Sequence, residues 1–257
     1  MRKPHIIPGV DPKLLIKDAA KLMPDPMRRG FLRNAMSLGA LAFLTGCDII
    51  DGDRAESALR KISEFNDGAQ ALLFSKTKLA PTYTEADLTR PFPFNAYYDE
   101  DEAPMVDGET YKLEVSGLVD NKKPWTLAEL HALPEVSQIT RHCCVEGWSA
   151  IGSWQGAMLS EFLTRIGADT KAKYVWFKCA EGYTNTIDMP TALHPQTQMT
   201  FKYDHKILPR AYGFPMKVRM PTKLGYKNPK YVVAMEVTNT DRGGYWEDQG
   251  YNWFGGL

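Results

Sequence analysis

The stretch that decides how this chain folds and works is Arg141-His142-Cys143-Cys144-Val145-Glu146-Gly147-Trp148-Ser149. Residues 137–144 alternate apolar and polar side chains, which predicts a strand. Neighbouring cysteines on a strand point to opposite faces, so they are poorly placed to bind one metal ion together. The spaced Cys/His partners of a tetrahedral zinc site are also lacking. A single thiolate whose pKa is lowered by the positive charge of Arg141 and His142 is expected as a lone ligand or nucleophile, with a buried structural cysteine as the equal alternative.

The composition predicts a folded domain with a sizeable core. The 257 residues are 44% hydrophobic and include 6 Trp, 12 Tyr and 11 Phe, which argues against disorder. The formal net charge is zero, but residues 1–46 carry eight Lys or Arg against three Asp, so the remainder holds 23 basic and 28 acidic residues. A mildly acidic body argues against nucleic acid as a partner, because such binding needs a basic face.

The first residues read as an export signal. Met27-Arg28-Arg29-Gly30-Phe31-Leu32-Arg33 precedes an uncharged, modestly apolar run over residues 34–44. The run is too short to span a bilayer comfortably and fits the apolar segment of a signal. The pattern resembles a twin-arginine signal, which exports folded proteins, so the periplasm is the expected location. A basic amphipathic helix is the alternative.

The apolar run ends in Leu44-Thr45-Gly46-Cys47, which resembles a bacterial lipobox. Lipid attached to Cys47 would hold the protein at the membrane surface without a spanning helix. Asp48 comes next and resembles an inner-membrane retention signal. Ordinary cleavage, with Cys47 lost or incidental, is the alternative. We therefore expect a signal over residues 1–47, a charged tether or surface helix over 48–77, and a single folded domain over 78–257.

Short strands, short helices and many Pro or Gly joints predict a mixed α+β domain. A Pro-rich extended segment is expected from Lys78 to Phe94. His194 is expected in a loop with a core or surface role, and His205 in an exposed turn. The other expected elements are strands at 111–119, 137–144, 174–178 and 231–237, and helices at 126–133, with a Thr cap, and 158–166, ended by Gly167.

Arg141-x-x-Cys144-Val145-Glu146-Gly147-Trp148-Ser149 resembles the molybdenum-ligand loop of the sulfite-oxidase family, and is most similar to its methionine-sulfoxide-reductase branch. The resemblance implies that Cys144 binds the metal. Soft thiolate suits a metal that two dithiolene sulfurs of a pterin already hold. Arg141 would orient an anionic group near the metal, or else form an ordinary ion pair. Cys143 has no counterpart.

Two further stretches carry implied pterin contacts. Phe94-Asn95-Ala96-Tyr97-Tyr98-Asp99 resembles the family's Asn-x-x-Tyr-Glu, which implies that Asn95, Tyr98 and Asp99 contact the cofactor, with Asp in place of Glu. In Phe177-Lys178-Cys179, Cys179 takes the position of a Thr contact, so a thiol replaces a hydroxyl there.

Residues 208–221 resemble the family's phosphate-binding segment. Tyr212 takes the position of a His or Asn, and Lys217 that of an Arg, with Arg219 two residues later. Basic side chains and backbone donors of this loop would hold the pterin phosphate. Residues 225–230, Gly-Tyr-Lys-Asn-Pro-Lys, match the family's pattern Gly-x-Lys-x-x-Lys. The contacts that this pattern implies are Asn228, Pro229 and Lys230.

The resemblance implies one sulfite-oxidase-type domain without a C-terminal immunoglobulin-like domain, a molybdenum–molybdopterin cofactor and oxygen-atom transfer. The preferred activity is reduction of a sulfoxide or N-oxide by a monomeric catalytic subunit that takes electrons from a membrane haem or quinone-linked partner. A sulfite-oxidising dehydrogenase is the first alternative. The others are a metal-free thiol enzyme that uses Cys144 with His142, and a non-catalytic lipoprotein that binds a small molecule.

Overall fold

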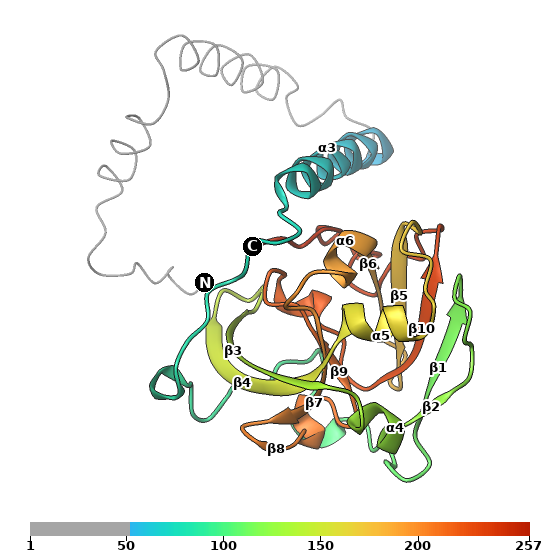
Figure 1. The fold of residues 1–257 in the computed structure, drawn as a ribbon. Coiled ribbons are helices and arrows are strands. Elements are labelled where there is room, and N and C mark those ends of the chain that lie inside the picture. The colour runs from blue at the N-terminus through green and yellow to red at the C-terminus, as the bar shows by residue number, and fades with distance from the viewer. Residues whose placement is uncertain (1–51) are drawn as a thin grey trace. The chain divides into compact units, whose positions relative to one another are not determined.

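A computed structural model of the chain describes residues 52–257. Residues 60–257 form one compact unit, and of the unit before it only residues 52–59 are described. Two five-stranded sheets dominate the compact unit, and the few helices are short (Figure 1). The expected mixed α/β fold is therefore confirmed.

The first sheet has the strand order β2-β1-β10-β5-β6. β1 runs parallel to β10, and every other pair in this sheet is antiparallel. β1 alternates exposed and buried side chains, as its sequence predicts. The strands of this sheet are β1 (Lys112–Gly117), β2 (Trp125–Thr126), β5 (Tyr174–Cys179), β6 (Thr184–Asp188) and β10 (Val232–Thr238).

The second sheet is antiparallel, with the order β3-β4-β7-β8 and β9 paired to β7. Figure 1 shows β3 and β4 as a long curved hairpin. Of these strands the sequence analysis predicts β3 alone. β4 is buried along most of its length and lacks alternation. β7 alternates polar and apolar residues, but its polar Gln198 and Thr200 are buried as well. The strands are β3 (Glu135–Cys143), β4 (Ser149–Met158), β7 (Gln198–Tyr203), β8 (Lys206–Ile207) and β9 (Lys217–Arg219).

The helices begin and end at residues that the local sequence predicts. Thr126 caps α4 through a reciprocal pair of hydrogen bonds with Glu129, and α5 is followed by Gly167 in the left-handed region at φ 63°. No helix among residues 52–257 is long and apolar enough to cross a membrane. The helices are α3 (Gly52–Leu73), α4 (Leu127–His131), α5 (Leu159–Arg165) and α6 (Met189–Ala192), with 3-10 turns at Glu85–Asp87, Glu100–Glu102, Arg210–Tyr212 and Gly225–Lys227.

One continuous core joins both sheets to α5. Leu113 of β1, Phe162 of α5 and Val218 of β9 are among its fully buried members. Full burial of each such side chain contributes about 1.5–3 kcal/mol. The core therefore fixes the ends of both sheets relative to one another, and the candidate site lies at those ends.

The segment over residues 78–94 is extended apart from the 3-10 turn at Glu85–Asp87, and polar contacts hold it in place. Gln196 accepts a hydrogen bond from the Ala80 backbone N–H at 2.7 Å and donates one back to the Ala80 carbonyl at 3.1 Å. His194 is fully buried and its Nε2 lies 3.0 Å from the Lys78 carbonyl, which confirms its core role, while His205 lies exposed in a turn. These contacts hold the segment in place, so the residues that follow it reach the candidate site.

A buried ion pair fastens the C-terminal segment. Lys227 Nζ pairs with Glu247 Oε1, and the two side chains are 1% and 5% exposed. Asn185 donates to the same oxygen at 3.0 Å, and Lys227 also donates to the Thr186 carbonyl at 2.7 Å. The pair ties the C-terminal segment to the β6 strand and to the loop before β10.

We expect Glu247→Gln to lower the free energy of unfolding by about 3–5 kcal/mol, because it leaves the Lys227 ammonium buried without its counter-charge. Urea unfolding measures the change. The double variant Lys227→Met/Glu247→Leu is expected to recover most of the loss, because it removes both charges. A single variant as stable as the parent would show that the pair contributes nothing.

Candidate functional site

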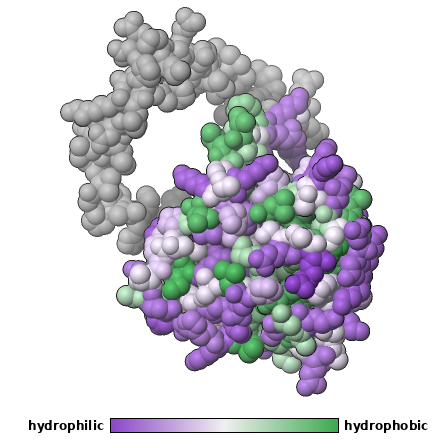
Figure 2. Space-filling view, viewed as in Figure 1, coloured by the Kyte–Doolittle hydropathy of each residue, from purple (hydrophilic) through white to green (hydrophobic). Residues whose placement is uncertain are grey.

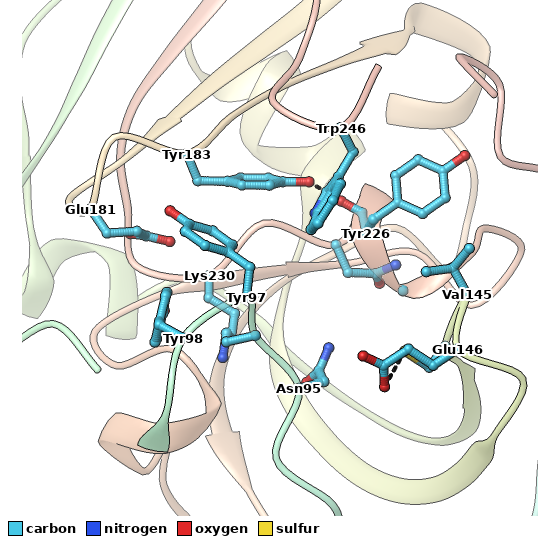
Figure 3. A pocket seen from close by; sticks show the side chains of 14 residues that line it. Asn95, Tyr97, Tyr98, Val145, Glu146, Glu181, Tyr183, Tyr226, Lys230 and Trp246 are labelled. Carbon is cyan, nitrogen blue, oxygen red and sulfur yellow. Dashed lines mark hydrogen bonds between the residues drawn. The ribbon is translucent and has the colours of Figure 1, made fainter. Parts of the chain in front are cut away.

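A cavity of about 100 Å³ opens between loops of the two sheets and residues 95–98, which follow the extended segment (Figure 3). This volume holds several water molecules. The loop after β3, the turn between β5 and β6, and the loop before β10 contribute to its wall. Its lining residues are Asn95, Ala96, Tyr97, Tyr98, Cys144, Val145, Glu146, Glu181, Tyr183, Gly225, Tyr226, Asn228, Lys230 and Trp246.

Cys144 lies at this cavity in a tight turn after β3. Its backbone N–H donates to the Trp148 carbonyl at 2.9 Å, and Gly147 donates back to the Cys144 carbonyl at 3.2 Å. Gly147 has φ 92°, a conformation that favours glycine. Glu146 Oε2 lies 3.7 Å from the Cys144 sulfur and accepts a hydrogen bond from Trp148 Nε1 at 2.8 Å. The turn therefore presents one thiol beside one oriented carboxylate.

Burial raises the pKa of the Cys144 thiol, so the expectation that positive charge lowers it was wrong. The side chain of Arg141 is exposed, and its guanidinium carbon lies 5.3 Å from the centre of the Tyr83 ring, away from the lining of the cavity. His142 is 1% exposed, and burial together with the nearby cation Lys217 lowers its pKa well below its ordinary value. Neither residue therefore supplies a cation to the thiol.

Near His142, two residues before Cys144, lies a group of buried basic side chains: Lys217, Arg219 and Lys230 are 1%, 2% and 7% exposed. Within residues 52–257 none of them has a carboxylate within ion-pairing distance. Arg219 instead donates to His142 Nδ1 at 2.9 Å and to Thr140 Oγ1 at 3.0 Å, and its Nε has no partner there.

Lys217 has the least compensation of the three cations. Its ammonium lies 5.2 Å from the centre of the Trp154 ring and makes no hydrogen bond to a described residue, and Arg219 approaches the same ring at 4.8 Å. Burial, with repulsion by Arg219 and Lys230, lowers the pKa of Lys217 well below its ordinary value, and burial alone lowers the pKa of Lys230 to about 8. Unpaired buried charge is unfavourable, so this cluster is built to receive an anion.

The sequence profile of the "Oxidoreductase molybdopterin binding domain" matches residues 100–246, more than half of the chain. The chain belongs to the molybdopterin-binding oxidoreductases. It is 61% identical over 240 residues to the "putative protein-methionine-sulfoxide reductase subunit YedZ1" of Azospira oryzae, covering 93% of this chain and 92% of that one. It is 28% identical over 161 residues to the "protein-methionine-sulfoxide reductase catalytic subunit MsrP" of Ralstonia nicotianae, covering 56% of this chain and 49% of the relative.

Among solved structures, the sulfane dehydrogenase SoxCD of Paracoccus pantotrophus shares the fold, with a TM-score of 0.51 and 17% identity. The match covers 54% of this chain and 40% of that one. The predicted sulfite-oxidase-family fold and the predicted molybdopterin-dependent enzyme class are confirmed by these similarities.

The buried residues of this molybdopterin-binding oxidoreductase fit the cofactor. Lys217, Arg219 and Lys230 provide unpaired positive charge for a phosphate, and the orphaned Arg219 Nε provides a further donor. No group of three or more His, Cys, Asp or Glu side chains among residues 52–257 could hold a metal ion. One soft thiolate, Cys144, suits a metal whose remaining ligands are cofactor sulfurs.

Some of the expected site residues of the oxidoreductase line the cavity, and others do not. Asp99 precedes a 3-10 turn, Cys179 is 1% exposed on β5, and the Tyr212 hydroxyl donates to the Phe92 carbonyl at 2.8 Å. Arg141 lies outside, and Lys217 and Pro229 are not among the lining residues either. The expected residues that line the cavity are Asn95, Tyr98, Cys144, Asn228 and Lys230.

Glu181 was not expected at the site. It stands on the turn between β5 and β6, and Figure 3 shows it on the far side of the cavity from Glu146, beyond Tyr97 and Lys230. Its Oε2 is buried and has no hydrogen-bond partner among the described residues. Burial raises the pKa of this carboxyl to about 7.

We expect Glu181 to make the cofactor-free protein less stable as the pH rises from 4.5 to 7. A carboxyl whose pKa is raised on folding favours the folded state below its ordinary pKa, and this contribution is lost as it ionises. The shift corresponds to about 3 kcal/mol at most, and partial exposure reduces this to about 1–2 kcal/mol. Urea unfolding of the parent and of Glu181→Gln across this range measures it. Parallel pH profiles would contradict the expectation.

Proposed function

We propose that this molybdopterin-dependent oxidoreductase carries molybdenum and reduces a sulfoxide of the methionine type, with electrons from a membrane haem or quinone-linked partner. The similarity to proteins named as methionine-sulfoxide reductases supports this substrate class. The twin-arginine pattern at Arg28 and Arg29 supports a periplasmic location. Lipid attachment at Cys47 would keep the protein at the inner membrane, and both features lie outside the described residues. We take the chain as a monomeric catalytic subunit.

The charge of the side chains that line the cavity favours a neutral substrate over an anionic one. The acidic and basic side chains that line it are Glu146, Glu181, whose pKa burial raises to about 7, and Lys230. The guanidinium of Arg141, which a sulfite pocket would use, lies outside the wall. With Lys230 assigned to the cofactor phosphate, the remaining acidic and basic groups of the wall are the carboxyls of Glu146 and Glu181, which disfavour a sulfite dianion and accept a neutral sulfoxide.

The aromatic side of the cavity suits a thioether. Tyr97, Tyr183 and Trp246 line it, and Tyr97 stacks on Tyr245 with ring centres 4.7 Å apart. Sulfur–aromatic contacts contribute about 0.3–1.5 kcal/mol. Such rings would hold the methyl and methylene groups of a methionine-type substrate.

Some residues of the chain would hold the cofactor, and others would position the substrate. When bound, the molybdenum–molybdopterin supplies the two-electron oxygen-atom chemistry. Cys144 would bind the metal through its thiolate, while Lys217, Arg219 and Lys230 hold the phosphate. Asn95, Tyr98, Asn228 and Pro229 would contact the pterin. Reduction of a sulfoxide to a thioether consumes two electrons and two protons and releases water.

The test is elemental analysis beside two assays. Protein purified from a host that makes the cofactor is expected to hold about one molybdenum per chain and to reduce methionine sulfoxide with an artificial electron donor. Faster turnover of sulfite with an electron acceptor would favour the sulfite-oxidising alternative. A folded protein without molybdenum would favour the non-catalytic binding protein.

A further inference from the structure

Polar side chains on one face of the helix α3 bind the C-terminal segment. Asp67 accepts a hydrogen bond from the Phe254 backbone N–H at 2.9 Å, and Gln70 accepts one from the Gly256 N–H at 3.1 Å. One turn later Phe74 packs edge-on against the Phe254 ring, with centres 5.6 Å apart. These residues are three to four positions apart, so they share one face of the helix. That face is committed to the C-terminal segment.

The opposite face is apolar and exposed. Ile62, Phe65, Leu72 and Leu73 are 54%, 76%, 86% and 84% exposed. At 100° per residue their directions fall within about 100° of arc, roughly opposite to Asp67. Figure 2 shows hydrophobic side chains at the surface of α3. We call these four residues the apolar stripe.

An apolar stripe turned to solvent marks an interaction surface, because an amphipathic helix ordinarily buries this side. The basic side chains near it suit anionic lipid. Lys61 lies beside the stripe, and Lys76 and Lys78 follow the end of the helix, all three exposed. Residues 60–73 of the helix carry two carboxylates, Glu64 and Asp67. Asp67 is hydrogen bonded on the other side of the helix.

We propose that α3 lies on the surface of a phospholipid bilayer, with the apolar stripe in the boundary of the acyl chains and the lysines at anionic headgroups. The position along the chain supports a bilayer over a soluble partner, because α3 begins five residues after Cys47, the proposed lipid-bearing residue. To that extent the inference rests on the proposed anchoring. The affinity of the stripe for a bilayer needs neither the lipid nor the catalytic activity.

The stripe would give the anchor a second point of attachment. The apolar stripe and the nearby lysines would add their own affinity for the bilayer to that of lipid at Cys47. Because Asp67 and Gln70 fix the same helix to the catalytic unit, contact of α3 with a bilayer would also restrict how that unit turns at the membrane.

Vesicle sedimentation tests the proposal on the chain from Asp48 onward, which contains α3 and the whole compact unit without the signal. We expect it to sediment with vesicles of phosphatidylethanolamine and phosphatidylglycerol. Phe65→Glu is expected to weaken this binding at least about tenfold, whereas Phe65→Leu should retain it. Gly68→Glu is the matched control, because it adds the same charge outside the stripe where a Cβ meets no atom within 4 Å.

Two results would overturn the proposal. One is a parent chain that stays in the supernatant, whether or not the stripe makes it self-associate in analytical ultracentrifugation. The other is equal binding by Phe65→Glu and Gly68→Glu. Circular dichroism checks that both variants fold. Cys144→Ser should bind vesicles like the parent, so failure of the proposed catalysis and failure of bilayer binding are separate results.

Discussion

Replacement of Cys144 by Ser is expected to lower methionine-sulfoxide reduction by more than about 100-fold and to change the electronic absorption of the bound metal. Loss of an outer-shell partner already costs about 10–100-fold in metal affinity or activity, and Cys144 is the proposed direct ligand. A hydroxyl is a harder and far less acidic ligand than a thiol, so it is a poor match for a metal held by sulfur. Steady-state kinetics, absorption spectra and elemental analysis on the same preparations measure the effect.

Cys143→Ser is the control for this prediction. Cys143 belongs to β3 and is not among the residues that line the cavity, although it is the immediate neighbour of Cys144. We expect the activity and the absorption spectrum of the Cys143→Ser variant to stay close to those of the parent. Loss of the metal spectrum in Cys143→Ser with retention in Cys144→Ser would exchange the roles of the two thiols and contradict the proposed ligand.

Strands with one solvated face could be predicted from the sequence, and strands buried on both faces could not. β1 shows the alternation that its sequence predicts, and β3 was also found. In β4 almost every side chain is buried, so the periodicity of two disappears. A Cβ at Gly156 would lie 1.9 Å from the Met199 carbonyl oxygen, so this glycine is explained by a strand pairing that the local sequence does not reveal.

The candidate site was predictable where one short motif contains it. Cys144 and the loop around Lys230 come from such motifs, and both reach the cavity. Glu181 and Trp246 reach it only because the first sheet and the C-terminal segment fold together, and neither has a local pattern that marks it.

Strand geometry explains why Arg141 is not among the residues that line the cavity. Arg141 and His142 are consecutive on β3, so one side chain is exposed and the other is buried. The alternation that separates the two cysteines also separates these two residues, so both cannot lie beside the thiol. Arg219, in contrast, is two residues from Lys217 on β9, so the pattern of the strand places both cations on the same side.

Replacement of Lys217 by Met is expected to stabilise the cofactor-free protein and to empty the site of its cofactor. In the absence of an anion, the buried ammonium has no ion pair or hydrogen bond among the described residues and only the Trp154 ring as compensation. Exchange of buried charges for apolar side chains of similar volume is often neutral or stabilises a protein by about 1–4 kcal/mol. With the phosphate bound, the same ammonium forms a charge-assisted contact, so its loss weakens retention of the cofactor.

Two measurements separate this prediction from a purely structural role of Lys217. Urea unfolding of protein from a cofactor-deficient host should show a gain in stability, and elemental analysis of protein from a cofactor-competent host should show a loss of molybdenum. The pKa of Lys217 is lowered on folding, so its penalty fades as the pH rises toward the ordinary value of 10.5. The stability of the cofactor-free parent should therefore rise with pH in this range, and that of Lys217→Met should rise less.

Lys223→Met is the matched control, because it also removes a buried ammonium. Lys223 is 2% exposed, and its Nζ donates to the Phe254 carbonyl at 2.9 Å, at the C-terminal segment and outside the lining of the cavity. Its loss should change stability without changing the molybdenum content. If Lys217→Met instead destabilised the cofactor-free protein and kept its molybdenum, the buried cations would be part of the scaffold, and the phosphate would have to bind elsewhere.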